Sequence, residues 1–307
     1  MIETSVIMAT YKEDKDFLVQ SIESILKQTY KNFEFIIILD NPQNKEHETL
    51  IKYYCRKDKR IRFYINEKNI GLTNTLNKAL TLAKGYYICR MDADDISMTN
   101  RIEIQKKYLE DNNFDLVGGI SQIIDEKGDI IYSIKKVPTD FNKIKKCIKY
   151  NQVISHPTWF GKKEVFEKLK GYRNIPLCED YDFTLRAILL GYKISNVNKV
   201  VLSYRMTENS ISRSNLFEQY LYAKYISYQY KKGRIADVTK SNEYVKQKDN
   251  QKKAIRYLKA NKRFNDTLKD VENKQYVKFV KDGFILTFTS YHYLFKIVRL
   301  IMVTLNS

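Results

Sequence analysis

Three carboxylates stand within four positions of this chain, at Asp92, Asp94 and Asp95, directly after an apolar and aromatic run at 86–91. The run has the composition of a strand, and the acids follow it as a loop. Neighbouring carboxylates repel one another unless a cation neutralises them. Because one or two carboxylates together with substrate phosphates are usual ligands of Mg²⁺ or Mn²⁺, the pattern indicates a divalent metal site. A solvated acidic turn is the alternative, since Asp-x-Asp triplets also occur at 14–16 and 180–182.

A second acidic feature is the pair Glu179 and Asp180, which precedes apolar residues at 183, 185, 188 and 189. This spacing predicts a helix that begins at the two acids. Acids at the start of a helix often do no more than cap it and compensate its dipole. The residues alone therefore favour a structural role for this pair.

The elements that position the first acidic cluster alternate between strand and helix. Apolar runs predict strands at 5–9, 33–39, 61–65 and 86–91, and apolar residues at three- and four-residue steps predict helices at 17–26, 46–55 and 72–83. This alternation implies right-handed βαβ units and a mostly parallel, Rossmann-like sheet with helices on both faces. Ligands of such sheets bind beyond the carboxyl ends of the strands, where Thr10, Tyr11, Asp40 and the acidic cluster converge.

The middle of the chain predicts a helix at 101–109, a hairpin formed by 114–124 and 130–137, and a helix at 140–150. The first strand of the sheet is followed by residues 9–13, which contain no glycine. A sugar-nucleotide nucleotidyltransferase, the alternative enzyme class, normally has a glycine-rich phosphate loop at that place. The sequence therefore argues against it.

Composition predicts a globular protein, because 43% of the 307 residues are hydrophobic. Four cysteines without CxxC spacing and three scattered histidines form no zinc pattern, so we expect reduced thiols. Residues 1–9 lack the basic start and long apolar stretch of a signal peptide. We therefore expect a cytoplasmic protein.

The net charge of +18 is concentrated in residues 216–307, which contain 19 Lys and Arg against 8 Asp and Glu and so carry +11 of it. This excess suits a polyanion, either anionic lipid or nucleic acid, or it serves solubility alone. We expect helices at 216–230 and within 240–281. The apolar segment 284–305 is interrupted by Lys296 and Arg299, which favours an amphipathic helix in a membrane interface, with both cations at lipid phosphates, over a spanning helix.

An ordered series of motifs across residues 1–212 resembles family 2 glycosyltransferases of the GT-A nucleotide-diphospho-sugar transferase fold, in particular those that build bacterial capsular and other surface polysaccharides. The matching stretches are 6–11, 28–34 with Asp40, 69–72 with Asn77, 91–95 with Arg101, 171–173, and 179–182 with Arg186 and Gly191. Any one stretch is weak evidence, whereas the series in this order is specific.

The resemblance implies roles at the donor site. Asp40 is expected to contact the nucleotide base, with Thr10 and Tyr11 lining the same pocket, and Asp92 to hold the ribose. Asp94 is expected to ligate the Mn²⁺ or Mg²⁺ that bridges the diphosphate. Asn69 and Asn77 belong to the same donor-binding set.

The resemblance also implies that Asp180 is the base that deprotonates the acceptor for in-line attack with inversion, with Glu179 beside it. His156 and Trp159 are acceptor-side candidates. The alternatives are a locally hydrogen-bonded turn histidine and a core tryptophan.

Two departures from the family pattern concern the phosphates and the metal. Residues 75–77 lack the arginine that many relatives place there for phosphate contact, and Thr207 stands where many relatives have a histidine that serves as a metal ligand. Arg205 is expected to meet the diphosphate, because its guanidinium suits bidentate phosphate contact.

These observations predict a GT-A catalytic domain at 1–215 and a basic, mainly helical region at 216–307, with a membrane-interface helix at 284–305. The predicted function is inverting, metal-dependent transfer of a sugar from a nucleotide diphosphate donor, UDP-linked, to a lipid-linked surface glycan. The expected location is the inner face of the cell membrane, bound to its anionic surface and not to nucleic acid. A non-catalytic membrane- or nucleic-acid-binding protein is the alternative from another class. It leaves the converging acids unexplained, because acids repel phosphate.

Overall fold

The computed structural model describes residues 2–207, 215–272, 285–286 and 289–307. The chain divides into two compact units, one formed by residues 1–145, 152–174 and 183–207 and the other by 146–151, 175–182 and 208–307. Within the part of the chain that the structure describes, no helix has the length and apolar character needed to cross a membrane.

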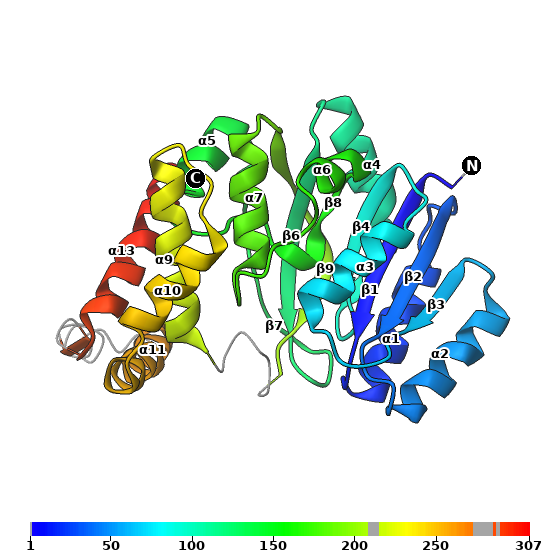
Figure 1. The fold of residues 1–307 in the computed structure, drawn as a ribbon, viewed down its shortest axis with the longest axis horizontal. Helices are drawn as coiled ribbons and strands as arrows, with labels where there is room; N and C mark the ends of the chain where they lie inside the picture. Colours follow the sequence, from blue (N-terminus) through cyan, green and yellow to red (C-terminus); the bar gives the residue numbers. More distant parts are fainter. Residues whose placement is uncertain (1, 208–214, 273–284, 287–288) are drawn as a thin grey trace. The chain divides into compact units, whose positions relative to one another are not determined.

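The first unit is built on a nine-stranded sheet with the order β3-β2-β1-β4-β8-β6-β9-β5, and β7 pairs with β6. Figure 1 labels these strands except β5. Four parallel strands form one half of the sheet, as predicted. They are β1 Thr4–Thr10, β2 Phe33–Leu39, β3 Ile61–Ile65 and β4 Tyr87–Asp92. Their connecting helices are α1 Lys15–Leu26, α2 Lys45–Lys57 and α3 Leu72–Leu82. Each element lies within a few residues of its predicted position.

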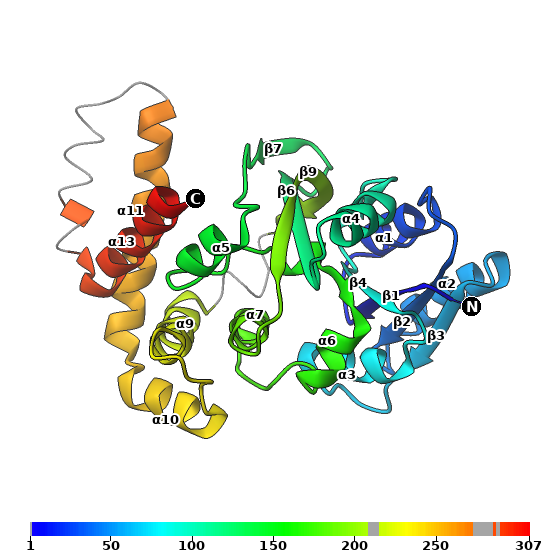
Figure 2. The ribbon, with the colours of Figure 1, turned by 90° about the horizontal axis from the view of Figure 1, so that it is seen from above.

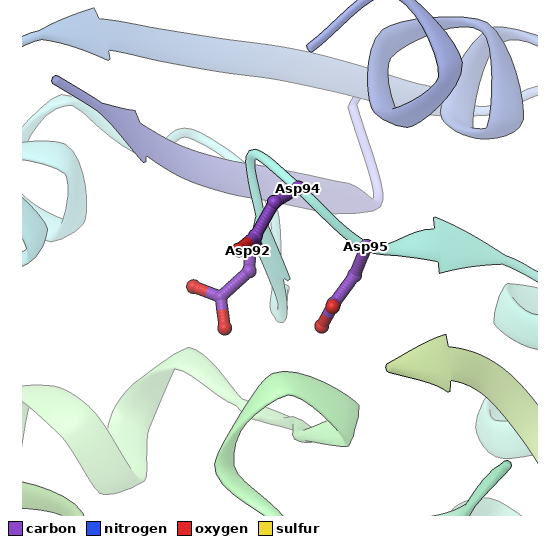
Figure 3. Close-up of side chains that lie close together, drawn as sticks. All are labelled: Asp92, Asp94 and Asp95. Atoms are coloured by element: carbon purple, nitrogen blue, oxygen red, sulfur yellow. The ribbon is translucent and has the colours of Figure 1, made fainter. Parts of the chain in front are cut away.

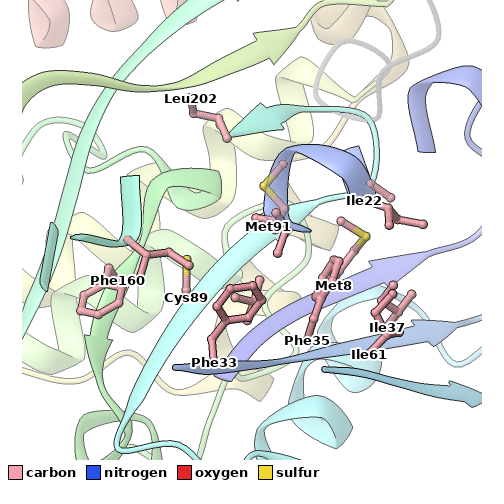
Figure 4. Packing of buried hydrophobic residues seen from close by; sticks show 14 of the residues in the cluster. Met8, Ile22, Phe33, Phe35, Ile37, Ile61, Cys89, Met91, Phe160 and Leu202 are labelled. Carbon is pink, nitrogen blue, oxygen red and sulfur yellow. The ribbon is translucent and has the colours of Figure 1, made fainter. Parts of the chain in front are cut away.

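Helices cover both faces of this half (Figure 2). On one face, Leu18, Ile22 and Ile25 of α1 pack with residues of α2 and of α4 (Arg101–Asp111) against alternate residues of the strands. Figure 4 shows this core around Met8, Phe35 and Met91. Alternation puts the even-numbered residues of β4 on the opposite face, the one that α3 covers. The carboxyl ends of β1, β2 and β4 therefore reach one edge with both faces of the sheet already packed.

The other half of the sheet contains strands that the sequence analysis did not assign. These are β5 Ile96–Ser97, β8 Phe160–Lys162 and β9 Ile194–Arg205. β8 is antiparallel to β4 and β6, whereas β9 is parallel to β6 with two register shifts. β8 is three residues long, and β9 carries exposed polar residues at its centre, so neither has the apolar pattern of a strand. The 3-10 turn η1 (His156–Thr158) and helix α6 (Lys163–Lys168) flank β8 and were likewise not predicted.

The predicted hairpin forms from β6 Leu116–Ile124 and β7 Ile130–Ser133, and the predicted helix at 140–150 is α5 Phe141–Cys147. Helix α7 spans Glu179–Leu189, so it begins at the residue that the sequence indicated.

The second unit consists mainly of helices, as predicted: α9 Leu216–Lys231, α10 Val238–Lys248, α11 Gln251–Glu272 and α13 Tyr291–Asn306. α9 packs on α10 and α11, and α11 packs on α13, through rings that include Phe217, Tyr220, Tyr257 and Tyr293. Much of 273–288, which the sequence analysis assigned to basic helix and to the start of the apolar segment, lies outside the described residues.

The prediction that Lys296 and Arg299 face lipid phosphates is wrong in this structure. The Lys296 amine lies over the rings of Tyr257 and Tyr293, and Arg299 donates a hydrogen bond to the carbonyl of Tyr150. Both cations turn toward the helical unit because aromatic faces and a carbonyl oxygen are available there.

Candidate active site

The three acids of the predicted metal site meet in the loop between β4 and β5 (Figure 3). One carboxylate oxygen from each of Asp92, Asp94 and Asp95 lies within 4.8 Å of the others. The Asp92 carboxylate also forms an ion pair with the guanidinium of Arg90, which is 3% exposed. The prediction that these acids lie close together at the end of the strand is confirmed.

Arg205, at the end of β9, holds this loop in place. Its backbone N–H donates to Oδ1 of Asp95 over 2.9 Å, and its Nε donates to the carbonyl of Asp94 over 2.9 Å. The rest of the guanidinium binds two carbonyls of the β6–β7 turn and the side chain of Gln20, and it lies over the ring of Phe17. Arg205 was expected to meet a diphosphate, but here it is buried and its donors are engaged by protein groups.

Electrostatic repulsion makes the cluster receptive to a cation. Burial, followed by the charges of Asp92 and Glu13, raises the pKa of Asp94 to about 7. Burial, followed by Asp92 and Asp94, raises the pKa of Asp95 well above its ordinary value. Oδ2 of Asp95 is buried and finds no hydrogen-bond partner among the described residues. A divalent cation supplies what this cluster lacks, so the residues fit the metal that the resemblance implied.

The predicted nucleotide side of the site is organised by Asp40, which follows β2. Its carboxylate accepts hydrogen bonds from the side chain of Asn66 (2.7 Å) and from the backbone N–H groups of Ile70 (2.9 Å) and Gly71 (2.8 Å). The chain can turn here because Gly71 has φ of +81°, a value that favours glycine. Asp40 thus fixes the loop that carries the exposed side chain of Asn69.

Thr10 and Tyr11 lie beside this loop at the end of β1. The Thr10 hydroxyl donates to Glu13 (2.7 Å), whereas the ring of Tyr11 is 38% exposed. His47, which the sequence analysis did not single out, is buried with its Nδ1 3.3 Å from Thr10 Oγ1 and its Nε2 3.0 Å from the carbonyl of Glu13. The sequence did not indicate this contact, because His47 lies on α2, far along the chain from Thr10.

Asn77 is engaged in holding a second loop. Its Oδ1 accepts from the backbone N–H of Tyr172 (2.8 Å), and its Nδ2 donates to the carbonyl of the same residue (2.9 Å). Gly171 has φ of +69°, and a Cβ there would lie 2.3 Å from Asn77 Oδ1. In this structure the amide predicted to bind the donor connects α3 to the 171–173 turn.

His156 and Trp159 belong to one aromatic cluster. His156 Nε2 lies 2.9 Å from the hydroxyl of Tyr172, and burial together with the charge of Arg90 lowers the pKa of His156 well below its ordinary value. Trp159 is fully buried, donates from Nε1 to the carbonyl of Ile154, and contacts the rings of His156 and Tyr172. Of the two interpretations left open for Trp159, the structure supports the core one.

Glu179 and Asp180 occupy the first turn of α7, and both are partly exposed. Burial, together with their charges, raises the pKa of the neighbouring Cys178 thiol. A carboxylate in the first turn of a helix interacts favourably with the helix dipole, and a carboxylate can also act as a general base.

Comparison of the sequence with known protein families identifies the class of protein that has this acidic site beyond a parallel sheet. Residues 5–170 match the family model for glycosyl transferase family 2. The chain belongs to this family. It is a glycosyltransferase, and the resemblance read from the ordered motifs is confirmed.

Three curated relatives carry the same activity in their names. An uncharacterised glycosyltransferase of Methanocaldococcus jannaschii is 42% identical over 72% of this chain and 77% of its own. The O-antigen biosynthesis glycosyltransferase WbnJ of Escherichia coli is 37% identical over 69% and 83%. A UDP-Gal:alpha-D-GlcNAc-diphosphoundecaprenol beta-1,3-galactosyltransferase of Escherichia coli is 32% identical over 73% and 86%.

The fold is that of the GT-A glycosyltransferases. The structure of S. aureus TarS 1-349, solved in complex with UDP-GlcNAc, superposes with a TM-score of 0.61 over 79% of this chain and 70% of that one. The sequences are 17% identical, so this likeness concerns the fold alone.

Arg90, which pairs with Asp92, is a residue of the site that the sequence analysis did not single out. It stands two positions before Asp92, and residues two apart in a strand share a face. The sequence could have indicated this role, because Arg90 interrupts an otherwise apolar strand and lies on the same face of it as the predicted metal ligand Asp92.

Proposed function

We propose that this glycosyltransferase moves a sugar from a UDP-linked donor to a glycan carried on a lipid, with a divalent metal and inversion at the anomeric carbon. The observation that carries the proposal is the cluster of Asp92, Asp94 and Asp95, whose mutual repulsion a cation relieves. The names of two relatives support these classes of donor and acceptor. The Escherichia coli galactosyltransferase is named for UDP-Gal and a diphosphoundecaprenol-linked sugar, and WbnJ is named for O-antigen biosynthesis.

The residues divide the work as follows. Asp94, with Asp92 and Asp95 beside it, would hold Mn²⁺ or Mg²⁺, which when bound stabilises negative charge on the leaving diphosphate. Thr10 and Tyr11, at the end of β1, line the nucleotide side together with Asn69, whose loop Asp40 anchors. Asp180 accepts the proton of the attacking hydroxyl, because a sugar hydroxyl is a weak nucleophile at neutral pH.

Thermal unfolding in the presence of nucleotides tests the donor and the metal. UDP is expected to raise the melting temperature with Mn²⁺ and not with EDTA, and GDP is expected to have a smaller effect, because ligands that bind only the folded state stabilise it. A UDP response that persists in EDTA would contradict the metal assignment. NMR of the first-formed product from a UDP-sugar and a lipid-linked acceptor then reports inversion or retention directly.

We also propose that the apolar face of α13 lies on an anionic membrane. Side chains 42–74% exposed recur along this face at helical spacing: Tyr291, Phe295, Val298, Ile301 and Leu305. The face carries no charge, and exposed cations of α11, at Lys252, Lys253, Arg256 and Lys259, supply the attraction to anionic headgroups.

Flotation of the full chain with anionic and with neutral liposomes tests this docking. The double change Val298→Asp and Ile301→Asp is expected to abolish flotation, because it places two charges on the apolar face. The control Ile130→Asp alters an equally exposed apolar residue of β7 and should leave flotation unchanged. If the protein does not float with anionic liposomes at low salt, the membrane proposal is wrong.

A further inference from the structure

Arg90 differs from the other buried arginines in how its donors are used. The structure describes four buried arginines, Arg90, Arg101, Arg186 and Arg205. The guanidinium groups of the last three donate to several acceptors each, most of them backbone carbonyls. A guanidinium has five N–H donors, yet among the described residues Arg90 makes a single side-chain hydrogen bond, from Nη1 to Asp92.

Burial keeps most of the Arg90 side chain from water. The side chain is 3% exposed, and its Nε is buried without a hydrogen-bond partner among the described residues. Leaving a buried donor of a charged group unpaired is costly. The described residues of the site therefore leave much of the hydrogen-bonding capacity of this cation unused.

Arg90 lies on the face of β4 that Asp92 shares, next to the acidic loop. Its guanidinium is close enough to interact electrostatically with Asp92, Tyr172, Asp95 and His156. The two positions that the family pattern offers for phosphate contact do not supply a spare guanidinium, because residues 75–77 contain no arginine and Arg205 donates to Asp94 and Gln20.

We propose that Arg90 is a binding residue for the diphosphate of the nucleotide donor, and that Asp92 holds it in place until the donor and metal arrive. This inference rests on the proposed function, because it assumes a nucleoside diphosphate in the site. Binding of the metal competes with Arg90 for Asp92, and the guanidinium then turns its unused donors to phosphate oxygens. Arginine is suited to this because its planar donors match phosphate geometry.

The charge of Arg90 predicts opposite effects on metal and nucleotide binding, which a purely structural ion pair would not produce. Removing the positive charge of Arg90 makes the acidic cluster more negative and leaves Asp92 without a competitor, so metal binding alone becomes tighter. The same change removes a cation that faces the added negative charge of the diphosphate, so nucleotide binding becomes weaker. A residue that only orients Asp92 would, when lost, weaken metal binding.

The test measures two affinities on Arg90→Gln. Electron paramagnetic resonance of free Mn²⁺ gives metal affinity without nucleotide, and calorimetry at saturating Mn²⁺ gives UDP affinity. We expect Mn²⁺ to bind at least as tightly as to the wild type and UDP to bind about 10- to 100-fold more weakly, the range for losing a charged hydrogen bond. Arg90→Lys keeps the positive charge but loses the planar set of guanidinium donors. Its Mn²⁺ affinity should therefore stay at the wild-type value, and its UDP affinity should fall less than that of Arg90→Gln.

Arg62→Gln is the matched control. It breaks another ion pair of the sheet, the 2.5 Å contact of the 24% exposed Arg62 with the 3% exposed Glu34 between β2 and β3, and should change neither affinity. Weaker Mn²⁺ binding in Arg90→Gln, or UDP affinity within twofold of the wild type, overturns the proposal. If the wild type itself fails to bind UDP with Mn²⁺, the proposed donor fails instead, whatever Arg90 does.

Discussion

Replacing Asp94 by asparagine should stabilise the metal-free protein at alkaline pH while it destroys metal binding. The substitution keeps the shape of the side chain and removes one of three repelling charges. In the wild type the ordinary pKa of 3.8 is raised to about 7 by burial and by the charges of Asp92 and Glu13. The folded state therefore holds a proton on Asp94 at pH values where the unfolded chain has lost it.

The sign and size of the effect follow from this pKa. A raised carboxyl pKa contributes stability that is fully present below the unfolded value and is lost as pH rises through the folded value. Between pH 5 and pH 7 the loss is two pH units at about 1.36 kcal/mol each, or about 2.7 kcal/mol. Asp94→Asn has no such loss. Its stability relative to the wild type should therefore rise by about 2 to 3 kcal/mol between pH 5 and pH 8.

Chemical unfolding in EDTA across this pH range measures the difference, which corresponds to a change in melting temperature of roughly 5 to 10 °C. Calorimetry with Mn²⁺ on the same preparation should show binding by the wild type and none by the variant. Asp111→Asn, at an exposed carboxylate of α4, is the control and should follow the wild type at every pH. A stability difference that does not change with pH would refute the electrostatic account of the acidic loop.

Two further changes test the base and the loop support. Asp180→Asn keeps the size of the side chain but removes the proton acceptor, so turnover should fall by about 10² to 10⁴ while UDP affinity persists. Near-normal turnover would leave Asp180 with a structural role alone and make Glu179 the next candidate. Gly171→Ala should destabilise the protein by about 1 to 3 kcal/mol in urea unfolding, because φ is +69° and the new Cβ meets Asn77 Oδ1. An unchanged free energy of unfolding in Gly171→Ala would show that the turn adjusts to the new Cβ without loss of stability.

The first half of the fold was predictable because its elements are long and its apolar patterns are unambiguous. β2, with seven buried residues in succession, has the composition of a strand covered on both faces. β8 and β9 were not predictable on this basis, since three residues give no period and Asn198 and Lys199 interrupt the longer strand. Their places are set by pairing with β6, which no local pattern encodes.

The candidate site was predictable in its acids and not in its arginines. A cluster of carboxylates is visible in sequence because the residues are adjacent. Arg205 was assigned to phosphate on its type and on the resemblance, yet its guanidinium donates to Gln20 and to the carbonyls of Asp94, Asp125 and Glu126, all distant in sequence. Whether an arginine has donors to spare depends on acceptors that only the folded chain brings near.

The contrast between Arg205 and Arg90 explains how the loop tolerates its own repulsion. Arg205 binds mainly carbonyls and an amide, so it fixes the backbone of Asp94 and Asp95 without neutralising their carboxylates through a direct ion pair. Arg90 neutralises Asp92 alone. The two remaining carboxylates then relieve their repulsion by retaining protons, as their raised pKa values indicate. A cation bound at Asp94 must displace the proton that this carboxyl retains, so metal affinity should increase as pH rises through about 7.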